Sequence, residues 1–354
     1  MYKRIELRSD TCTYPTKEML NAMANAKLGN DGFGEDPTVK QLEKISSELF
    51  EKESALFVPS GTMGNLLAFL AHDKGKEEVI FDANHHSLVD EYGGVSVIAH
   101  RIPRPINGTG EYGIPTIEEI KSQIKGTDSA IKTGLIWLEN THNNAGGICL
   151  GHKYIEEVGR LAHKYNIPVH MDGARIFNAS ISMGVKVKEL CKYVDSVMFC
   201  LSKGLGCPVG SMLIGNADFI NNARIIRRRI GGQMRQAGVL AAAGIIALND
   251  MINRLRVDHN NAKKLAGELG NITELGIDIK KVQTNIVLCD LNGALLGKAK
   301  EISDALIEKG VFVNVRGKSK IRMVTHKDVS LEDIEATIDS FKDVIIKFKS
   351  YLKK

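Results

Sequence analysis

The stretch FCLSKGLGCPVGS, residues 199–211, places Lys203 between a serine and a glycine at the end of a mostly apolar run. That run, Val194–Cys200, predicts a strand, which the following glycines and proline would end. Strand ends are where α/β proteins hold their chemistry. A partly desolvated lysine there can lose its proton and act as an amine nucleophile, so Lys203 is a candidate for a Schiff base. The alternative is an ordinary surface lysine on a turn.

Apolar runs like this one recur along the chain and alternate with segments of helical spacing. Such alternation predicts a parallel or mixed sheet that is covered on both faces. The predicted strands of this sheet are Ala55–Val58, Val79–Asp82, Val95–His100, Gly134–Glu139, Ile167–Met171, Val194–Cys200 and Gly210–Ile214.

Three parts are predicted along the chain: an N-terminal arm (1–14), a large domain (15–255) and a small C-terminal α/β domain (256–354). Pro15 marks a first helix that would extend to about Lys27, and Asp36-Pro37 caps the next. A long helical segment over 237–269 would carry the chain into the small domain. There we expect strands at 286–290, 311–315 and 321–325 and helices at 294–309 and 331–351.

Composition excludes several classes of protein. The chain has 354 residues, 43% of them hydrophobic, and a net charge of +5 that clusters only at Arg224 and Arg227–Arg229. A small anion suits that cluster better than nucleic acid does. The six cysteines form no CxxC pair, which argues against disulfides and zinc and favours reduced thiols in a cytoplasm. No signal peptide or membrane span is expected, nor any metal.

Two further segments supply partners for a reactive lysine. Ser60-Gly61-Thr62 lies between a predicted strand and a helix N-terminus, a place that favours phosphate, although an ordinary capping turn is the alternative. Asp172 ends another apolar strand, where it could pair with Arg175 or with a protonated pyridine nitrogen. Pyridoxal phosphate chemistry needs such a lysine, carboxylate and phosphate site together, so the three segments predict this cofactor. No dinucleotide or P-loop motif is present.

These residues stand in motifs that run along nearly the whole chain. They are LRSDT, GEDPTVKQLE, PSGTMGN, LENTHN, MDGARIFNA, LSKGLG, PVGS, MRQAG and RMVTH. In this order they resemble the low-specificity L-threonine aldolases, which belong to the β-eliminating lyase group of fold-type I pyridoxal phosphate enzymes. The resemblance implies a large domain with a mostly parallel seven-stranded sheet, a small C-terminal α/β domain, and cleavage of L-threonine or L-allo-threonine to glycine and acetaldehyde. It also implies a homodimer or homotetramer.

The resemblance assigns roles to individual residues. Lys203 would bind the cofactor covalently, Asp172 would pair with its ring nitrogen, and Ser60, Gly61 and Thr62 would lie at its phosphate. His86 would lie against the ring and His142 would be a second active-site histidine; either could be the base. The remaining residues would be Arg175, Arg322 and Ser9 for the substrate carboxylate, and Arg228 and Arg235 for a phosphate of the neighbouring subunit.

Three residues depart from the pattern of that family. Phe33 stands where tyrosine is usual, Tyr14 replaces a common arginine, and Gln233 interrupts a run of glycines. Phe33 loses a hydroxyl, so substrate affinity or preference is what it would change. Other readings stay open: a β-eliminating lyase of an aromatic or other β-substituted amino acid, a phenylserine-type aldolase, or a non-catalytic protein that only binds pyridoxal phosphate.

Overall fold

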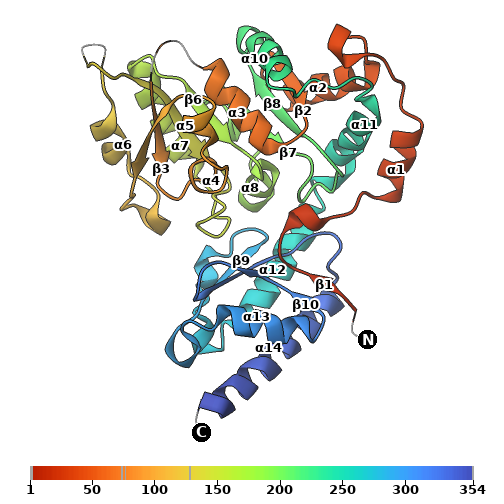
Figure 1. Ribbon diagram of the computed structural model, residues 1–354, viewed down its shortest axis with the longest axis vertical. Helices are drawn as coiled ribbons and strands as arrows, with labels where there is room; N and C mark the ends of the chain where they lie inside the picture. Colours follow the sequence, from red (N-terminus) through yellow and green to blue (C-terminus); the bar gives the residue numbers. More distant parts are fainter. Residues whose placement is uncertain (1–2, 73–74, 76, 127–128, 353–354) are drawn as a thin grey trace.

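A central sheet of seven strands has the order β2-β8-β7-β6-β5-β3-β4 (Figure 1). All neighbouring strands are parallel except that β8 runs antiparallel to both β2 and β7, which confirms the mostly parallel seven-stranded sheet. The computed structural model of the chain describes residues 3–72, 75, 77–126 and 129–352. Residues 1–2 of the predicted arm and 353–354 of the predicted small domain lie outside them. The strands are β2 Ser54–Val58, β3 Glu78–Asp82, β4 Ile102–Ile106, β5 Thr133–Glu139, β6 Val169–Asp172, β7 Ser196–Cys200 and β8 Ser211–Gly215.

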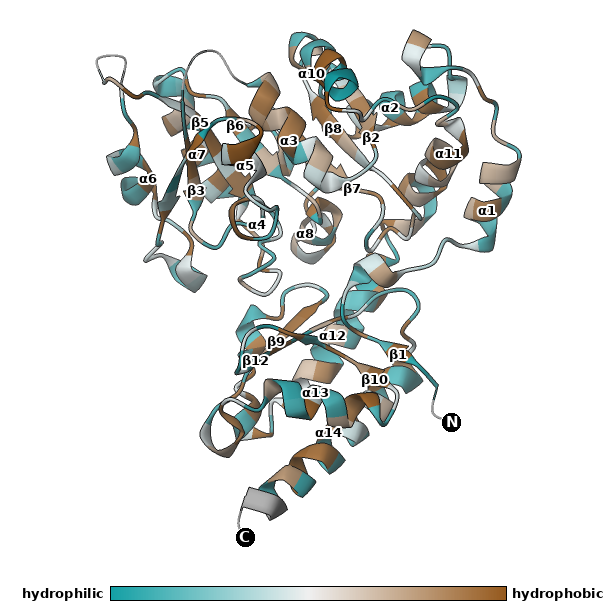
Figure 2. Ribbon diagram, in the orientation of Figure 1, coloured by the Kyte–Doolittle hydropathy of each residue, from teal (hydrophilic) through white to brown (hydrophobic). Residues whose placement is uncertain are grey.

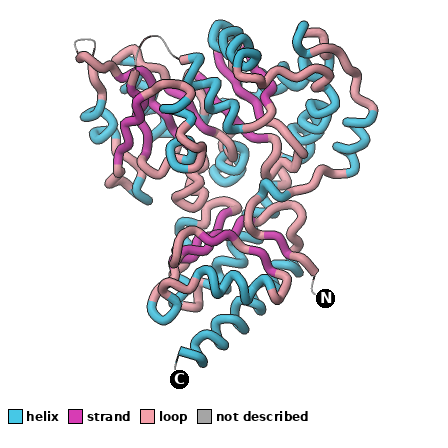
Figure 3. The backbone as a smooth tube through the Cα atoms, in the orientation of Figure 1, coloured by secondary structure: helices cyan, strands magenta, loops and turns pink. Residues whose placement is uncertain are grey.

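Helices cover both faces of this sheet (Figure 3). One predicted boundary is met closely, since α2 begins at Pro37 with Asp36 as its cap. These helices are α1 Lys17–Ala24, α2 Pro37–Phe50, α3 Gly61–Ala71, α4 His86–Val89, α5 Gly94–Val97, α6 Ile117–Gln123, α7 His152–Lys164, α8 Ile176–Met183, α9 Val187–Leu190, α10 Ala217–Arg229 and α11 Gly238–Ile246.

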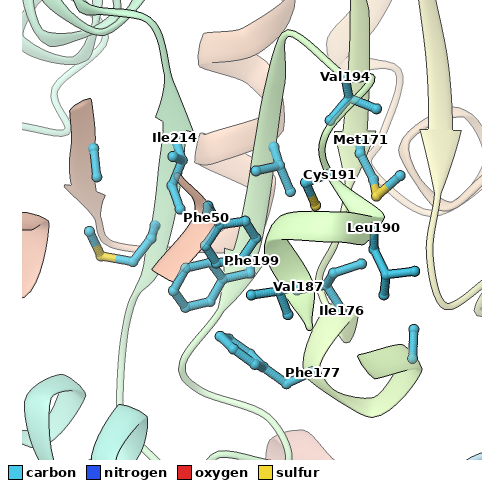
Figure 4. Close-up of a cluster of buried hydrophobic side chains, with 14 of the residues drawn as sticks. Phe50, Met171, Ile176, Phe177, Val187, Leu190, Cys191, Val194, Phe199 and Ile214 are labelled. Atoms are coloured by element: carbon cyan, nitrogen blue, oxygen red, sulfur yellow. The ribbon is translucent and has the colours of Figure 1, made fainter. Parts of the chain in front are cut away.

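Strand β7 packs against both layers because its side chains alternate. Phe199 faces α2 and α8, where it stacks on Phe50 (ring centroids 5.4 Å apart) and meets Phe177 edge-on at 5.2 Å (Figure 4). Met198 faces the other way, against α3, which approaches the strand closely at two glycines. A Cβ added at Gly61 would lie 2.8 Å from Cys200 Sγ, and one added at Gly64 would lie 2.6 Å from Met198 Cγ. The two layers therefore fix the direction in which the chain leaves β7 toward Lys203.

Helix α3 is apolar over most of its surface and packs on β7 and β8 of the sheet, beside α10 (Figure 2). A helix that is hydrophobic on nearly all sides is typical of a buried position. Among the described residues no single helix combines the length and apolarity of a membrane span. The segments Gly238–Met251 and Leu255–Leu269 pass such a test only as a pair bent by 67°.

The C-terminal part has two smaller sheets. Strands β11, β12 and β9 form an antiparallel sheet, and β10 pairs in parallel with β1 from the start of the chain. Ile5 and Leu7 consequently belong to the C-terminal hydrophobic cluster. The elements are β1 Ile5–Glu6, β9 Ile286–Asp290, β10 Val311–Phe312, β11 Asn314–Val315, β12 Lys320–Val324, α12 Leu255–Leu269, α13 Ala299–Ile307 and α14 Leu331–Leu352. The predicted domain boundaries at 14 and 255 stay a proposal.

Two of the predicted strands are wrong in their extent or type. The segment predicted as a strand over Val95–His100 holds α5, and the edge strand is Ile102–Ile106 instead. This strand, IPRPI, carries two prolines, which a sheet tolerates at an edge because one side of an edge strand needs no backbone donor. The segment Val311–Val315 divides between two sheets.

The helical segment predicted over 237–269 is not continuous. It includes a π-helical turn at Ala247–Met251 and bends before α12 begins at Leu255. The first helix begins at Lys17 rather than at Pro15, because Thr16 caps it by accepting the N–H of Met19 at 3.2 Å.

Two buried histidines predict how stability depends on pH. Burial lowers the pKa of His259 to about 4 and holds the pKa of His170 well below its usual value. Below pH 6.5 these two histidines are therefore protonated in the unfolded chain but stay neutral in the folded chain. Because the unfolded chain binds more protons, the free energy of unfolding should fall as the pH drops from 6.5 to 5. Urea unfolding across this range measures the slope. The His259→Gln variant should have a shallower slope, and an unchanged slope would contradict the prediction.

Candidate active site

The carboxyl ends of the parallel strands bring the predicted site residues to one edge of the sheet. Asp82 ends β3, Glu139 ends β5 and Asp172 ends β6. Lys203 follows β7 on a turn, where its carbonyl accepts the Thr13 hydroxyl at 3.0 Å and the Gly206 N–H at 2.8 Å. The lysine is half-buried. Because parallel strands end at the same edge, residues far apart in the sequence meet here.

Asp172 is a buried carboxylate with its oxygens already held. Oδ1 accepts the Ala174 N–H at 3.0 Å, and Oδ2 accepts Nδ2 of Asn65 on α3 at 2.8 Å. Burial alone would raise the pKa of Asp172, but the charges of His85, His86 and Lys203 hold it below its usual value. The side chain is thus an anion in a dry setting, which suits it to hold a cation such as a protonated ring nitrogen.

The first turn of α3 lies beside the same strands. Ser60 caps the helix by accepting the Met63 N–H at 3.2 Å, so the N–H groups of Gly61 and Thr62 begin the helix without intrahelical acceptors. Ser60 and Thr62 are exposed. Asn65 lies one helical turn after Gly61. The anion-binding start of α3 and the contact of this helix with Asp172 therefore lie on the same side of the helix.

His86, the first residue of α4, forms a hydrogen bond with Glu91, which lies two residues beyond the end of that helix. His86 Nδ1 lies 2.8 Å from Glu91 Oε1, and the same oxygen accepts Asn65 Nδ2 at 2.9 Å. Burial favours a lower pKa for His86, yet the bond with Glu91 and the charges of Asp172 and Glu139 raise it above its usual value. The neighbouring His85, by contrast, is fully buried between aromatic rings.

His142 is buried, with both ring nitrogens engaged. Nδ1 accepts the Ala145 N–H at 3.3 Å, and Nε2 lies 3.2 Å from Asp82 Oδ1. Burial works against its charged form, but Glu139 and Asp82 raise its pKa above the usual value. His142 and Asp82 also line a cavity of about 200 Å³ that Leu288 and Lys320 border from the C-terminal part.

Two buried arginines share one acceptor but differ in their charge balance. Arg175 binds Asp10 through two bonds of 2.7 Å and Asn143 Oδ1 through a third of 3.1 Å. Arg322 reaches the same Asn143 oxygen at 2.9 Å, and no ion pair is found for it within the described residues. Burial and the repulsion of Arg175 lower the pKa of Arg322 to about 9. Asp10 and Asp90, which pair with Arg175 and Arg316, act on Arg322 only through their charges, so its guanidinium is a buried cation without a directly paired carboxylate among the described residues.

Ser9 lies one residue before Asp10 and caps a short turn, where its Oγ accepts the Thr11 N–H at 3.2 Å. The chain thus brings Ser9, Lys203, Asp172, His86, His142, Arg175 and Arg322 into one region, linked through Asp10, Asn143, Asn65 and Glu139. Arg228 and Arg235 are exposed and lie around the loop at 29–35, where Arg228 lines a surface pocket with Phe33 and Gln233. Within one chain they are not joined to this region.

The basic cluster expected to hold a small anion is largely neutralised. Arg227 is buried and pairs with Asp31 at 2.6 Å, and Arg224 pairs with Glu43 at 2.8 Å. The exposed positions in the cluster are Arg228 and Arg229.

Several polar residues of this region were not predicted from the sequence. Asp10, Asn65 and Asn143 lie inside the motifs LRSDT, PSGTMGN and LENTHN, but each type of side chain is common in loops and caps. A signal exists for Asn65, since an amide in the middle of an apolar helix must find buried partners. Asp82 and Glu91 have no such signal, because carboxylates at strand ends and turns are ordinary surface residues.

Comparison with known proteins gives consistent matches. Residues 6–293 match the model of the family described as beta-eliminating lyase. The chain is 41% identical over 348 residues to low-specificity L-threonine aldolase 1 of Arabidopsis thaliana, covering 97% of each chain. It is also 41% identical over 334 residues to the low specificity L-threonine aldolase of Escherichia coli K12, covering 93% of this chain and 96% of that one.

Solved structures share the fold at low sequence identity. A threonine aldolase of Leishmania major superposes with a TM-score of 0.79 at 18% identity, covering 96% of this chain and 99% of that one. An SPT structure with pyridoxal phosphate superposes with a TM-score of 0.76 at 19% identity, covering 98% and 88%. The fold is therefore that of the fold-type I pyridoxal phosphate enzymes.

Proposed function

Because this chain belongs to the beta-eliminating lyase family, we infer that it is a pyridoxal-phosphate-dependent aldehyde-lyase that cleaves L-threonine and L-allo-threonine to glycine and acetaldehyde. Its substrate is a small β-hydroxy amino acid. The observation that carries this function is the Arg322 guanidinium, which is buried beside Arg175 without an anion of its own. A substrate carboxylate supplies that anion and can bind both guanidinium groups.

The residues present fit the cofactor. Asp172 is a buried anion, the start of α3 at Ser60, Gly61 and Thr62 suits a phosphate, and Lys203 is a half-buried amine after β7. Asn65 Oδ1 is buried and without a hydrogen-bond partner in the described part of the chain, so the region still offers an acceptor for a donor of a bound ligand. Pyridoxal phosphate, when bound, supplies an electron sink for cleavage of the carbon–carbon bond.

Each side chain then has a defined task. Lys203 Nζ would hold the cofactor covalently, and Asp172 would keep a proton on its ring nitrogen. Arg175, Arg322 and Ser9 hold the carboxylate, which orients the bond between Cα and Cβ for cleavage. A histidine, His86 or His142, accepts the proton of the β-hydroxyl. Its raised pKa makes it a stronger base, and burial limits the access of water.

We also propose a cytoplasmic homodimer or homotetramer with shared active sites. Arg228 and Arg235 are exposed cations without a role inside one chain, which supports a contact with the phosphate site of a neighbour. Phe33 is 77% exposed and lines the same surface pocket as Arg228, so one neighbouring chain would cover both; Tyr14 is 75% exposed. Light scattering of the purified protein measures the state, and a monomer with full activity would contradict the shared site.

The reaction is tested with purified enzyme, pyridoxal phosphate and three substrates: L-threonine, L-allo-threonine and phenylserine. Acetaldehyde is measured by its enzymatic reduction with NADH, and glycine by chromatography. We expect equal amounts of both products from the threonine diastereomers. Release of ammonia and a keto acid in place of the aldehyde would instead identify a β-eliminating lyase.

The Arg322→Leu variant should bind substrate poorly. Loss of one partner of a buried charged pair costs enough that KM for L-threonine should rise by about 10²-fold, while kcat falls less. Steady-state kinetics measures both constants, and the exposed arginine variant Arg160→Leu is the matched control. An unchanged KM in Arg322→Leu would remove this residue from the carboxylate site.

A further inference from the structure

The two candidate histidines differ in which ring nitrogen is free. His86 donates through Nδ1 to Glu91 Oε1 at 2.8 Å, since a carboxylate can only accept. Its Nε2 has no hydrogen-bond partner among the described residues, and its side chain is 29% exposed. The neutral ring therefore offers the Nε2 lone pair to a proton.

His142 has the opposite arrangement. The backbone N–H of Ala145 donates to Nδ1 at 3.3 Å, so this nitrogen carries no proton in the neutral ring. Nε2–H then donates to Asp82 Oδ1 at 3.2 Å. Both nitrogens are in use, the side chain is 3% exposed, and no lone pair remains for a substrate hydroxyl.

Glu91 is itself held in place. Its Oε1 accepts Asn65 Nδ2 at 2.9 Å, and the same amide nitrogen lies 2.8 Å from Asp172 Oδ2 and 3.1 Å from Ser87 Oγ. Two carboxylates as neighbours set the amide so that its NH₂ group faces them. Asn65 thus fixes the position of Glu91, which accepts the hydrogen bond of His86, relative to Asp172, which we propose pairs with the ring nitrogen of the cofactor.

We propose that Glu91 is a positioning residue that holds His86 in the Nδ1–H tautomer, so that His86 Nε2 takes the β-hydroxyl proton and His142 does not. The inference rests on the proposed function for the identity of the proton, but the tautomers themselves do not depend on it. In the step, the O–H bond breaks as a new N–H bond forms at Nε2, and the electron pair of that O–H bond becomes the carbonyl π bond. The electron pair of the broken Cα–Cβ bond stays with Cα, where the electron sink of the cofactor would stabilise it.

Glu91 is not alone in facing His86. Glu139 on β5 accepts the backbone N–H of His86 at 3.0 Å, and Asp172 on β6 acts on the ring through its charge. His85 precedes it on the same turn. These groups are unchanged in a Glu91 variant, so the effect of Glu91 can be separated from theirs.

The experiment has a spectroscopic part and a kinetic part. Ring nitrogens of the ten histidines are observed by ¹⁵N NMR of the holoenzyme, with His86→Gln and His142→Gln identifying the two signals. We expect the Nδ1–H tautomer for His86 and the Nε2–H tautomer for His142. In Glu91→Gln, the pKa of His86 should fall, because the anion that raises it is gone.

The kinetic part is the pH profile of kcat/KM for L-threonine. Its acid limb should move to lower pH in Glu91→Gln, with kcat reduced by roughly 10- to 100-fold. Glu91→Asp, which keeps the charge, should restore part of both. Asp82→Asn changes the acceptor of His142 and should leave the acid limb in place, and the exposed Glu157→Gln is the matched control.

Two results would overturn the proposal: an Nε2–H tautomer for His86, or an acid limb that follows Asp82→Asn instead of Glu91→Gln. Should Glu91→Gln fail to fold, the tautomers of the unchanged enzyme still decide the matter. If the unchanged enzyme released no acetaldehyde, the proposed function would fail while the tautomers and the pKa of His86 remained measurable.

Discussion

The Lys203→Ala variant is expected to lose aldolase activity by roughly 10⁴-fold or more, because it removes the amine that holds the cofactor and that the substrate replaces. The purified variant should also lack the long-wavelength absorbance of bound pyridoxal phosphate. In the unchanged enzyme, borohydride should fix the cofactor on the peptide that contains Lys203, which mass spectrometry can identify.

The fold should survive this substitution. Lys203 contributes its backbone carbonyl to the turn, through Thr13 and Gly206, and its side chain forms no ion pair in the described part of the chain. The far-UV circular dichroism of Lys203→Ala should match that of the exposed variant Lys164→Ala, and so should the urea midpoint when both proteins are stripped of cofactor, because a bound cofactor stabilises the folded state. Cofactor trapped on a different lysine would exclude Lys203 from its assigned role.

The Asp172→Asn variant is expected to keep the cofactor but to reduce kcat by roughly 10²- to 10³-fold, as the loss of one preorganised electrostatic partner does in other enzymes. An uncharged amide cannot hold a proton on the ring nitrogen, so the electron sink is weakened. Single-turnover kinetics with L-threonine measures the cleavage step, and the absorbance of the bound cofactor measures occupancy.

A control for this variant is Asp250→Asn, an exposed carboxylate that should leave kcat unchanged. Asn65 Nδ2 and the Ala174 N–H bind different oxygens of Asp172, so in Asp172→Asn one of these two donors loses its acceptor, and circular dichroism is needed to check that the fold is kept. A kcat within a factor of about two of the unchanged enzyme would mean that Asp172 does not face the ring nitrogen.

Most strands of the central sheet were predictable because a buried parallel strand is a short apolar run. The run at 95–100 misled for the same reason: apolar residues alone do not distinguish a strand from a helical turn, and the first three residues of this run belong to α5. The true edge strand, IPRPI, was hidden by Pro103 and Pro105, residues that usually exclude a strand. In both segments the position in the fold, and not the conformational preference of the local sequence, determined the secondary structure.

The sequence predicted the site residues that would react with or pair with the cofactor, because their type is unusual at their position. It did not predict the residues that support them, because those are of types common in loops. Lys203 and Asp172 stand at strand ends with few structural reasons to be there. Asp10, Asn143 and Glu91 are ordinary loop residues until the fold places them against Arg175, Arg322 and His86. Spacing along the chain carries no information on contacts between residues 165 positions apart, such as Asp10 and Arg175.

The pairing of β1 with β10 has a consequence for biosynthesis. Ile5 and Glu6 are synthesised about 300 residues ahead of their strand partners, Val311 and Phe312. At roughly 5–20 residues per second, about 15–60 s pass before these partners exist. Asp10 lies four residues after β1, so the carboxylate that neutralises Arg175 is held in place only after residues 311–312 have been synthesised. Nascent chains should therefore stay catalytically silent until late in their synthesis.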